Sequence, residues 1–408
     1  MSRPGRVGLV SLGVGLTAAA VGAVAGLATE RLAVRRGLDP GTANGPGAGT
    51  AGGGEAGGGS VGGGATGPDV AGLGQVRGVL HPVVADDGTA LHVEVDEPDA
   101  GAAPAPTVVF CHGYALTCDS WHFQRIALRG RYRLVFWDHR GHGRSPLGPP
   151  AGDPTAPVSL ERVGQDLGCV LDAVVPRGPV VLVGHSMGGM SIMSLLAQRP
   201  SLVTERLVGV ALVATSAGGL ARVDLGLPGL GPVIRRLAPP VTRILARTPG
   251  VEAGRRLGSD LESLLVRRYS YASPVPADLV QFTARMISTT SVAVISRFLP
   301  AFAGYDGAAA LDLLDGVPVL VLAGDADVLI PPAHSEAIAE AAPWAEFVLV
   351  HEAGHLVMLE HPDLVTVALR ELVDRALLIR GEGRHRRGTI RPRRTVIAVR
   401  PGSSGRAR

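Results

Sequence analysis

The sequence predicts an α/β fold in which a mostly parallel, eight-stranded sheet is flanked by helices. From Gly78 to about Arg380, short β-rich runs alternate with stretches of helical periodicity, and several of the runs are apolar throughout. Such alternation favours βα units, and continuously apolar runs are typical of parallel strands that are covered on both faces. Three cysteines without CxxC spacing are too few for a disulfide framework, so the hydrophobic core must hold the fold.

Eight runs carry the strand signal, at residues 79–84, 91–95, 107–111, 133–137, 180–183, 208–214, 317–323 and 347–350. Apolar residues recur at helical spacing over residues 159–175 and 363–378. About a hundred residues with helical patches but few strand signals separate the sixth run from the seventh. A connection of this length is an insertion, and we expect a helical cap over residues 219–311.

The N-terminal region has a different composition. Residues 7–29 contain no charged side chain, and 23 such residues are long enough to cross a bilayer as a helix. We therefore expect residues 1–36 to form a transmembrane anchor, with a cleavable signal peptide as the alternative, because Ala23-Val24-Ala25 resembles a cleavage site. The glycine-rich residues 37–77 are expected to be a flexible linker, ahead of a main domain at 78–380.

Charge is distributed unevenly along the chain. The net charge is +3, but residues 380–408 hold ten arginines against one acidic residue, Glu382, so the rest of the chain is acidic overall. We expect residues 381–408 to form a disordered, solvated basic tail. Contact with anionic lipid is the alternative, and lipid is a better partner than nucleic acid because the membrane anchor would bring the tail close to it.

The stretch "VGHSMGG" places Ser186 between Gly184 and Gly188, after an apolar run and before a helical one. This spacing is typical of a nucleophile elbow, in which a sharp turn presents the serine hydroxyl at the edge of a sheet. A nucleophilic hydroxyl needs a base and the base needs an acid. His355 follows the last strand, with His351 and His361 less well placed, while Asp325 and Asp327 compete as the acid.

Five segments together resemble the α/β-hydrolase fold superfamily, over residues 78–378: "VVFCHGY", "WDHRGHGRS", "VGHSMGG", "GDADVLIP" and "GHLVMLEHP". The resemblance implies a catalytic triad of Ser186, His355 and Asp327, the last being third after Gly324. It also implies an oxyanion hole formed by the backbone N–H groups of Tyr114 and Met187. It implies neither a cofactor nor a metal, although histidines crowd this region at His112, His122, His139, His142 and His185.

The resemblance implies a lipase-like serine esterase that cleaves a carboxylic ester through an acyl-enzyme. We expect the substrate to be small or lipophilic, because the apolar stretch "LPGLGPVIRRLAPPVTRIL" at 227–245 of the cap would suit a hydrophobic acyl chain. The same triad would serve an acyltransferase, a thioesterase or a perhydrolase, and a non-catalytic, membrane-tethered binding protein is the alternative from another class. We expect the protein to be anchored in a membrane by its N-terminal helix, on a side that the flanking arginines do not determine, or secreted if that segment is cleaved.

Overall fold

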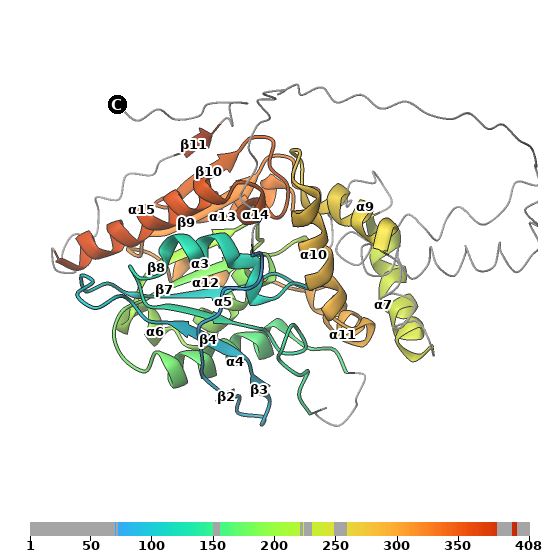
Figure 1. Cartoon of the computed structure of the whole chain (residues 1–408), viewed down its shortest axis with the longest axis horizontal. Helices are drawn as coiled ribbons and strands as arrows, with labels where there is room; N and C mark the ends of the chain where they lie inside the picture. Colours follow the sequence, from blue (N-terminus) through green and yellow to red (C-terminus); the bar gives the residue numbers. More distant parts are fainter. Residues whose placement is uncertain are drawn as a thin grey trace, which may run out of the picture.

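The computed structural model describes residues 70, 72–149, 156–220, 223, 231–248, 259–381 and 394–397. Within these ranges, nine strands form one sheet (Figure 1). Their spatial order is β1 (Val79–Leu80), β4 (Val93–Asp96), β6 (Leu134–Trp137), β5 (Thr107–Cys111), β7 (Val180–His185), β8 (Leu207–Val213), β9 (Val319–Gly324), β10 (Glu346–Val350) and β11 (Arg394–Ile397). Strand β4 pairs antiparallel with β1 and β6, and all other neighbours are parallel. The predicted α/β fold with a mostly parallel sheet is confirmed.

The strand count corrects the expectation of eight. The expected strand at 79–84 is divided, because Val83–Val84 forms β2 and pairs with β3 (Ala90–Leu91) in a separate two-stranded sheet. The ninth strand of the main sheet, β11, lies within the residues expected to be a disordered tail, and Arg394–Ile397 pairs in register with Phe347–Val350. β-branched residues suit a strand, and this strand covers the edge that β10 would otherwise expose.

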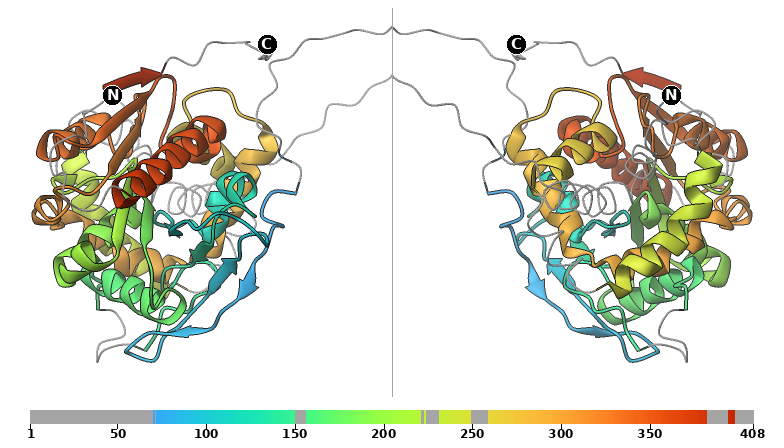
Figure 2. Two further views of the ribbon diagram at one scale, coloured as in Figure 1. Left: turned by 90° about the vertical axis from the view of Figure 1, so that its left-hand side faces the viewer. Right: turned by 90° about the vertical axis from the view of Figure 1, so that its right-hand side faces the viewer.

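Helices cover both faces of the sheet (Figure 2). On one face, α15 (Pro362–Gly381) packs on β8 and β9 and contacts α3 (His122–Leu128) and α14 (Val357–Glu360). On the other, α5 (Met187–Gln198) packs on β5 and β7 and contacts α4 (Leu160–Val174) and α12 (Ala309–Asp312), while α13 (Pro332–Ala341) packs on β9 and β10. The short α6 (Ser201–Glu205) leads into β8. This double covering explains why β5, β6, β7 and β9 are apolar and almost entirely buried.

Four helices between β8 and β9 gather at one end of the sheet (Figure 1). They are α7 (Gly231–Arg247), α9 (Ser259–Ser270), α10 (Ala277–Thr289) and α11 (Val292–Ala303). The Tyr114 hydroxyl, in the loop after β5, donates a 2.8 Å hydrogen bond to the carbonyl of Ile295 in α11. Helix α11 is therefore attached directly to the loop that follows β5 at the carboxyl edge of the sheet.

The expected membrane anchor at residues 1–36 and the linker up to residue 69 lie outside the described residues. Within the described ranges, no single helix combines the length and the apolar character of a membrane span, and α10 with α11 does so only as a pair bent by 90°.

Three buried histidines lie where the loops after β5 and β6 meet. The rings of His139 and His142 lie 4.4 Å and 5.6 Å from the ring of His112, measured between centroids. The Nε2 atom of His112 accepts a hydrogen bond from the backbone N–H of His139, so the proton of this neutral ring resides on Nδ1, which donates to the carbonyl of Gly113. Burial lowers the pKa of His112 to about 4, and burial together with the nearby His112 lowers that of His142 to about 3.

We expect the free energy of unfolding to fall as the pH falls from about 6.5 towards 4. In this window the unfolded chain protonates His112 and His142, whose ordinary pKa is 6.5, while the folded protein keeps both rings neutral. The unfolded state thus binds more protons, and each ring costs stability of about 1 kcal/mol per pH unit. Urea unfolding at pH 7 and pH 5 measures the change. His142→Gln should reduce the slope, and equal stability at both pH values would contradict the assignment.

Candidate active site

Ser186 occupies a sharp turn between β7 and α5, as the elbow prediction requires. Its backbone has φ 53° and ψ −119°, a conformation that L-residues rarely adopt and that costs about 1–3 kcal/mol. The turn is held on both sides, because the Ser186 N–H donates to Val213 at 2.9 Å and the Ser186 carbonyl accepts from the Thr215 hydroxyl at 2.6 Å. The strained residue is therefore fixed by the end of the neighbouring strand β8.

Gly184 and Gly188 are required by close packing at this turn. A Cβ at Gly184 would collide with the backbone of Gly188 and Gly189, and a Cβ at Gly188 would collide with the carbonyl of Cys111. The start of α5 thus lies directly against the end of β5. Because of this contact, Met187 at the first turn of α5 and Tyr114 after β5 lie at the same edge of the sheet, and both are buried.

Asp327 and His355 come together across the loops that follow β9 and β10. The Nδ1 atom of His355 lies 2.7 Å from Oδ2 of Asp327, and both side chains are almost completely buried. The other oxygen, Oδ1, accepts hydrogen bonds from the N–H groups of Leu329 at 2.8 Å and Ile330 at 3.0 Å. These two donors hold the carboxylate in the orientation that meets the imidazole.

The competing aspartate belongs to a different pair. Asp325 binds Nδ1 of His351, and the His351 side chain is largely exposed. The same hydrogen bond raises the pKa of His351. Of the two aspartates weighed from the sequence, only Asp327 contacts His355 in the described structure.

The pairing with Asp327 determines the tautomer of His355. An ionised carboxylate only accepts hydrogen bonds, so Nδ1 of His355 carries the ring proton and Nε2 carries a lone pair. Among the described contacts, this Nε2 atom has no hydrogen-bond partner although it is buried. A buried imidazole with an oriented Nδ1 and an unoccupied Nε2 can accept a proton from a nearby hydroxyl.

His185 links the Ser186 turn to the His355 loop. Its Nε2 atom donates to the carbonyl of His355 at 2.9 Å, and the two rings lie 4.7 Å apart between centroids. The described contacts include no hydrogen bond between Ser186 Oγ and His355 Nε2. The two residues therefore lie at the same edge of the sheet without a direct hydrogen bond between them. A hydrogen bond between a nucleophile and its base is often long before substrate binds.

Sequence reasoning missed three supporting residues. Thr215, two residues after β8, holds the Ser186 carbonyl, and His185, which the sequence showed only as one of five crowded histidines, binds the carbonyl of His355. Glu360, in "GHLVMLEHP", accepts a hydrogen bond from the N–H of Gly354, which directly precedes His355. An acidic residue five positions after the histidine was the available signal, but its other partners, Ala272 and Ser273, are distant in the sequence.

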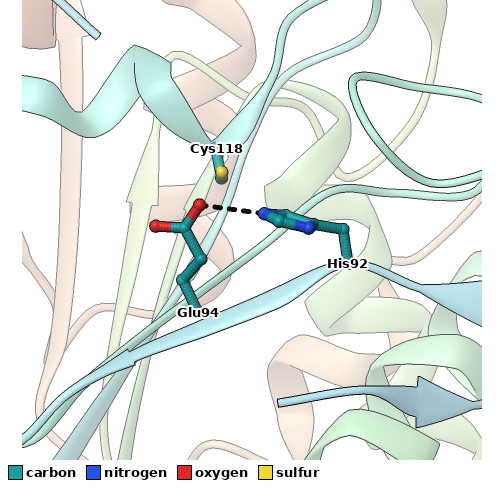
Figure 3. Close-up of side chains that lie close together, drawn as sticks. All are labelled: His92, Glu94 and Cys118. Atoms are coloured by element: carbon teal, nitrogen blue, oxygen red, sulfur yellow. Dashed lines mark hydrogen bonds and ion pairs between the residues drawn. The ribbon is translucent and has the colours of Figure 1, made fainter. Parts of the chain in front are cut away.

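His92, Glu94 and Cys118 lie close together away from this site, with their potential ligand atoms within 4.8 Å of one another (Figure 3). Glu94 accepts from His92 at 2.9 Å and from Arg125 at 2.7 Å, and a nitrogen of Arg144 lies 3.8 Å from both Glu94 and Cys118. Burial, with the nearby carboxylates, raises the pKa of the Cys118 thiol well above its ordinary value. A protonated thiol is a poor cation ligand, and the guanidinium groups of Arg125 and Arg144 already lie against Glu94, so we interpret this cluster as a structural ion-pair network.

Comparison with known proteins identifies the family to which the chain belongs. A model described as "Alpha/beta hydrolase family" matches residues 108–368. An sn-1-specific diacylglycerol lipase of Mus musculus is 30% identical over 268 residues, which cover 64% of this chain and 79% of the lipase. The polyketide synthase ThaQ of Burkholderia thailandensis is 26% identical over 312 residues, which cover 74% of this chain but only 14% of the synthase.

Solved structures agree on the architecture. A thermophilic esterase from Thermogutta terrifontis superposes with a TM-score of 0.56 at 24% identity, covering 73% of this chain and 99% of the esterase. At this identity the likeness shows the fold alone. The family model, in contrast, extends over more than half of the chain, so the chain belongs to the alpha/beta hydrolase family and is an enzyme of the hydrolase class.

Proposed function

We propose that this enzyme is a serine hydrolase that cleaves carboxylic esters through an acyl-enzyme intermediate. The observation that carries the proposal is the 2.7 Å contact between Asp327 and His355, which leaves Nε2 of His355 unoccupied on a loop tied to the Ser186 turn. In this proposal Ser186 is the nucleophile, His355 is the general base and Asp327 orients the imidazole.

The reaction would follow from these positions. His355 Nε2 takes the hydroxyl proton as Ser186 Oγ attacks the ester carbonyl, and Asp327 stabilises the resulting imidazolium. The backbone N–H groups of Tyr114 and Met187 stabilise the negative charge on the tetrahedral oxygen. The imidazolium then protonates the departing alcohol, and a water molecule, activated by the same nitrogen, releases the acid and restores Ser186.

A small or lipophilic ester is the substrate class that we propose. The ring of Tyr114 lies 5.1 Å from that of Phe302 and 6.1 Å from that of Phe298, between centroids, so aromatic side chains of α11 line the region beside the proposed oxyanion hole. The names of the relatives, a diacylglycerol lipase and an esterase, support ester-like substrates.

Ser186→Ala should abolish covalent labelling of the full-length protein by a fluorophosphonate probe. It should also lower kcat for p-nitrophenyl esters by about 10³-fold or more, because the acyl-enzyme of this proposal forms on the Ser186 hydroxyl. Ser191→Ala is the matched control: this serine lies in α5, five residues after Ser186, and its hydroxyl donates to the Gly188 carbonyl. Labelling of Ser186→Ala at the wild-type rate would refute the assignment of the nucleophile.

Asp327→Asn should lower kcat by about 10⁴-fold with little change in KM, because an amide NH₂ facing Nδ1 favours the tautomer in which Nε2 is already protonated. The matched control is Asp325→Asn, which removes the carboxylate that binds His351 and leaves the pair of Asp327 and His355 in place. Steady-state kinetics with p-nitrophenyl butyrate compare the two variants. Equal losses in both would show that Asp327 is not the acid of the triad.

We also propose that the N-terminal helix anchors the enzyme to a membrane, with the basic tail contacting anionic lipid. The support is the run of 23 uncharged residues at 7–29 and the arginines of residues 381–408. The full-length protein should remain in the membrane fraction after carbonate extraction, and a variant lacking residues 1–36 should be released. Release of both proteins would contradict the anchor.

A further inference from the structure

Glu360 is a buried carboxylate whose partners are main-chain groups and a hydroxyl. It lies at the end of α14 and is only 4% exposed. Its Oε1 atom accepts from the N–H groups of Ala272 at 2.8 Å and Ser273 at 2.5 Å, and from the Ser273 hydroxyl at 2.7 Å. Its Oε2 atom accepts from the N–H of Gly354 at 2.6 Å. Among the described residues, no arginine or histidine forms an ion pair with it.

These hydrogen bonds join the helical insertion to the loop that carries His355. Ala272 and Ser273 belong to the connection between α9 and α10, in the helical insertion. Gly354 belongs to the loop after β10 and directly precedes His355. The Glu360 carboxylate therefore links the backbone of the helical insertion to the backbone next to His355.

The residue on the other side of His355 is attached to the same segment. The N–H of Leu356 donates to the carbonyl of Ser270 at 3.0 Å. Gly354 also lies so close that an added Cβ would stand 2.7 Å from the Ser270 carbonyl oxygen and 2.9 Å from Cα of Tyr271. Both chain neighbours of His355 are thus held against residues 270–273.

Apolar packing holds this segment only in part. Tyr271 is buried in the hydrophobic core, but Ala272 is exposed and Ser273 is only partly buried. Ala272 also lines, with Asp327 and Gly354, a cavity of about 770 Å³. The position of residues 272–273 therefore depends strongly on their hydrogen bonds to Glu360. Hydrogen bonds to an ionised acceptor are roughly twice as strong as neutral ones, which suits a carboxylate to this task.

We propose that Glu360 is a positioning residue for His355: its carboxylate holds the histidine loop against residues 270–273 and so sets the imidazole relative to Ser186. This inference rests on the proposed function, in which His355 is the base. Glutamine cannot replace the carboxylate, because its NH₂ group would face either the Gly354 N–H or the three donors of residues 272–273. Either orientation leaves at least one of these N–H donors unpaired and displaces the loop.

The test compares four full-length proteins: wild type, Glu360→Gln, Ser273→Ala and Glu352→Gln. Glu352 lies in the same loop with an exposed side chain, which makes it the matched control. For each protein we would measure the fraction of sites labelled at completion by a fluorophosphonate probe, the rate constant of labelling, and kcat and KM for p-nitrophenyl butyrate. The labelled fraction reports folding, and the rate constant per site reports the position of the base.

In Glu360→Gln the labelled fraction should equal that of wild type, while the labelling rate constant and kcat fall about 10- to 100-fold with KM nearly unchanged, the scale of a misplacement of about 1 Å. Ser273→Ala, which removes one of the four donors, should show a smaller loss, and Glu352→Gln should behave as wild type. A wild-type rate constant per labelled site in Glu360→Gln would overturn the inference.

The outcomes separate this inference from the proposed function. If Glu360→Gln does not fold, Ser273→Ala decides, and an unchanged labelling rate in that variant rejects the positioning role. If wild type is labelled and Glu360→Gln is unimpaired, only the positioning role fails. If wild type is neither labelled nor active, the proposed function fails and the inference fails with it.

Discussion

The parallel pairing of β5, β7, β8, β9 and β10 is the constraint on which the site depends. In register, Cys111 pairs with Gly184, Gly184 with Leu212, Val213 with Leu322, and Gly324 with Val350, so five strands end at one edge. Helices bury both faces of these strands, and a shift of one residue would turn every side chain to the opposite face. The loops that follow the strands must therefore meet, although more than two hundred residues separate the first from the last.

Hydrogen bonds between these loops then fix the positions of the loops relative to one another. Thr215 holds the carbonyl of Ser186, His185 holds the carbonyl of His355, and Asp327 holds the imidazole of His355. Each bond joins loops that follow different strands, so none can move without breaking a contact with its neighbour. Groups fixed in this way before substrate arrives need little reorganisation during a reaction, which is the main advantage of a preorganised site. The strained backbone of Ser186 persists because its neighbours hold it.

The helical insertion is hydrogen-bonded to loops at the carboxyl edge of the sheet. Tyr114 bonds to Ile295 in α11, and residues 270–273 are joined to the histidine loop through Glu360 and Ser270. The helices that cover the edge therefore touch both the loop proposed to carry an oxyanion donor and the loop that carries His355. The shape of the substrate region and the alignment of the polar groups consequently depend on the same few contacts.

Local patterns in the sequence determined the α/β alternation, the turn at Ser186 and the loops that carry His355 and the two aspartates, because burial and glycine spacing act over a few residues. The residues alone left Asp325 and Asp327 open, and only the tertiary structure pairs the first with His351 and the second with His355. It also decided that Arg394–Ile397 joins the sheet and that Glu360 binds residues 272–273. These contacts form between segments far apart in the chain, and where such segments meet is set by the packing of the whole sheet and its helices, which no local pattern records.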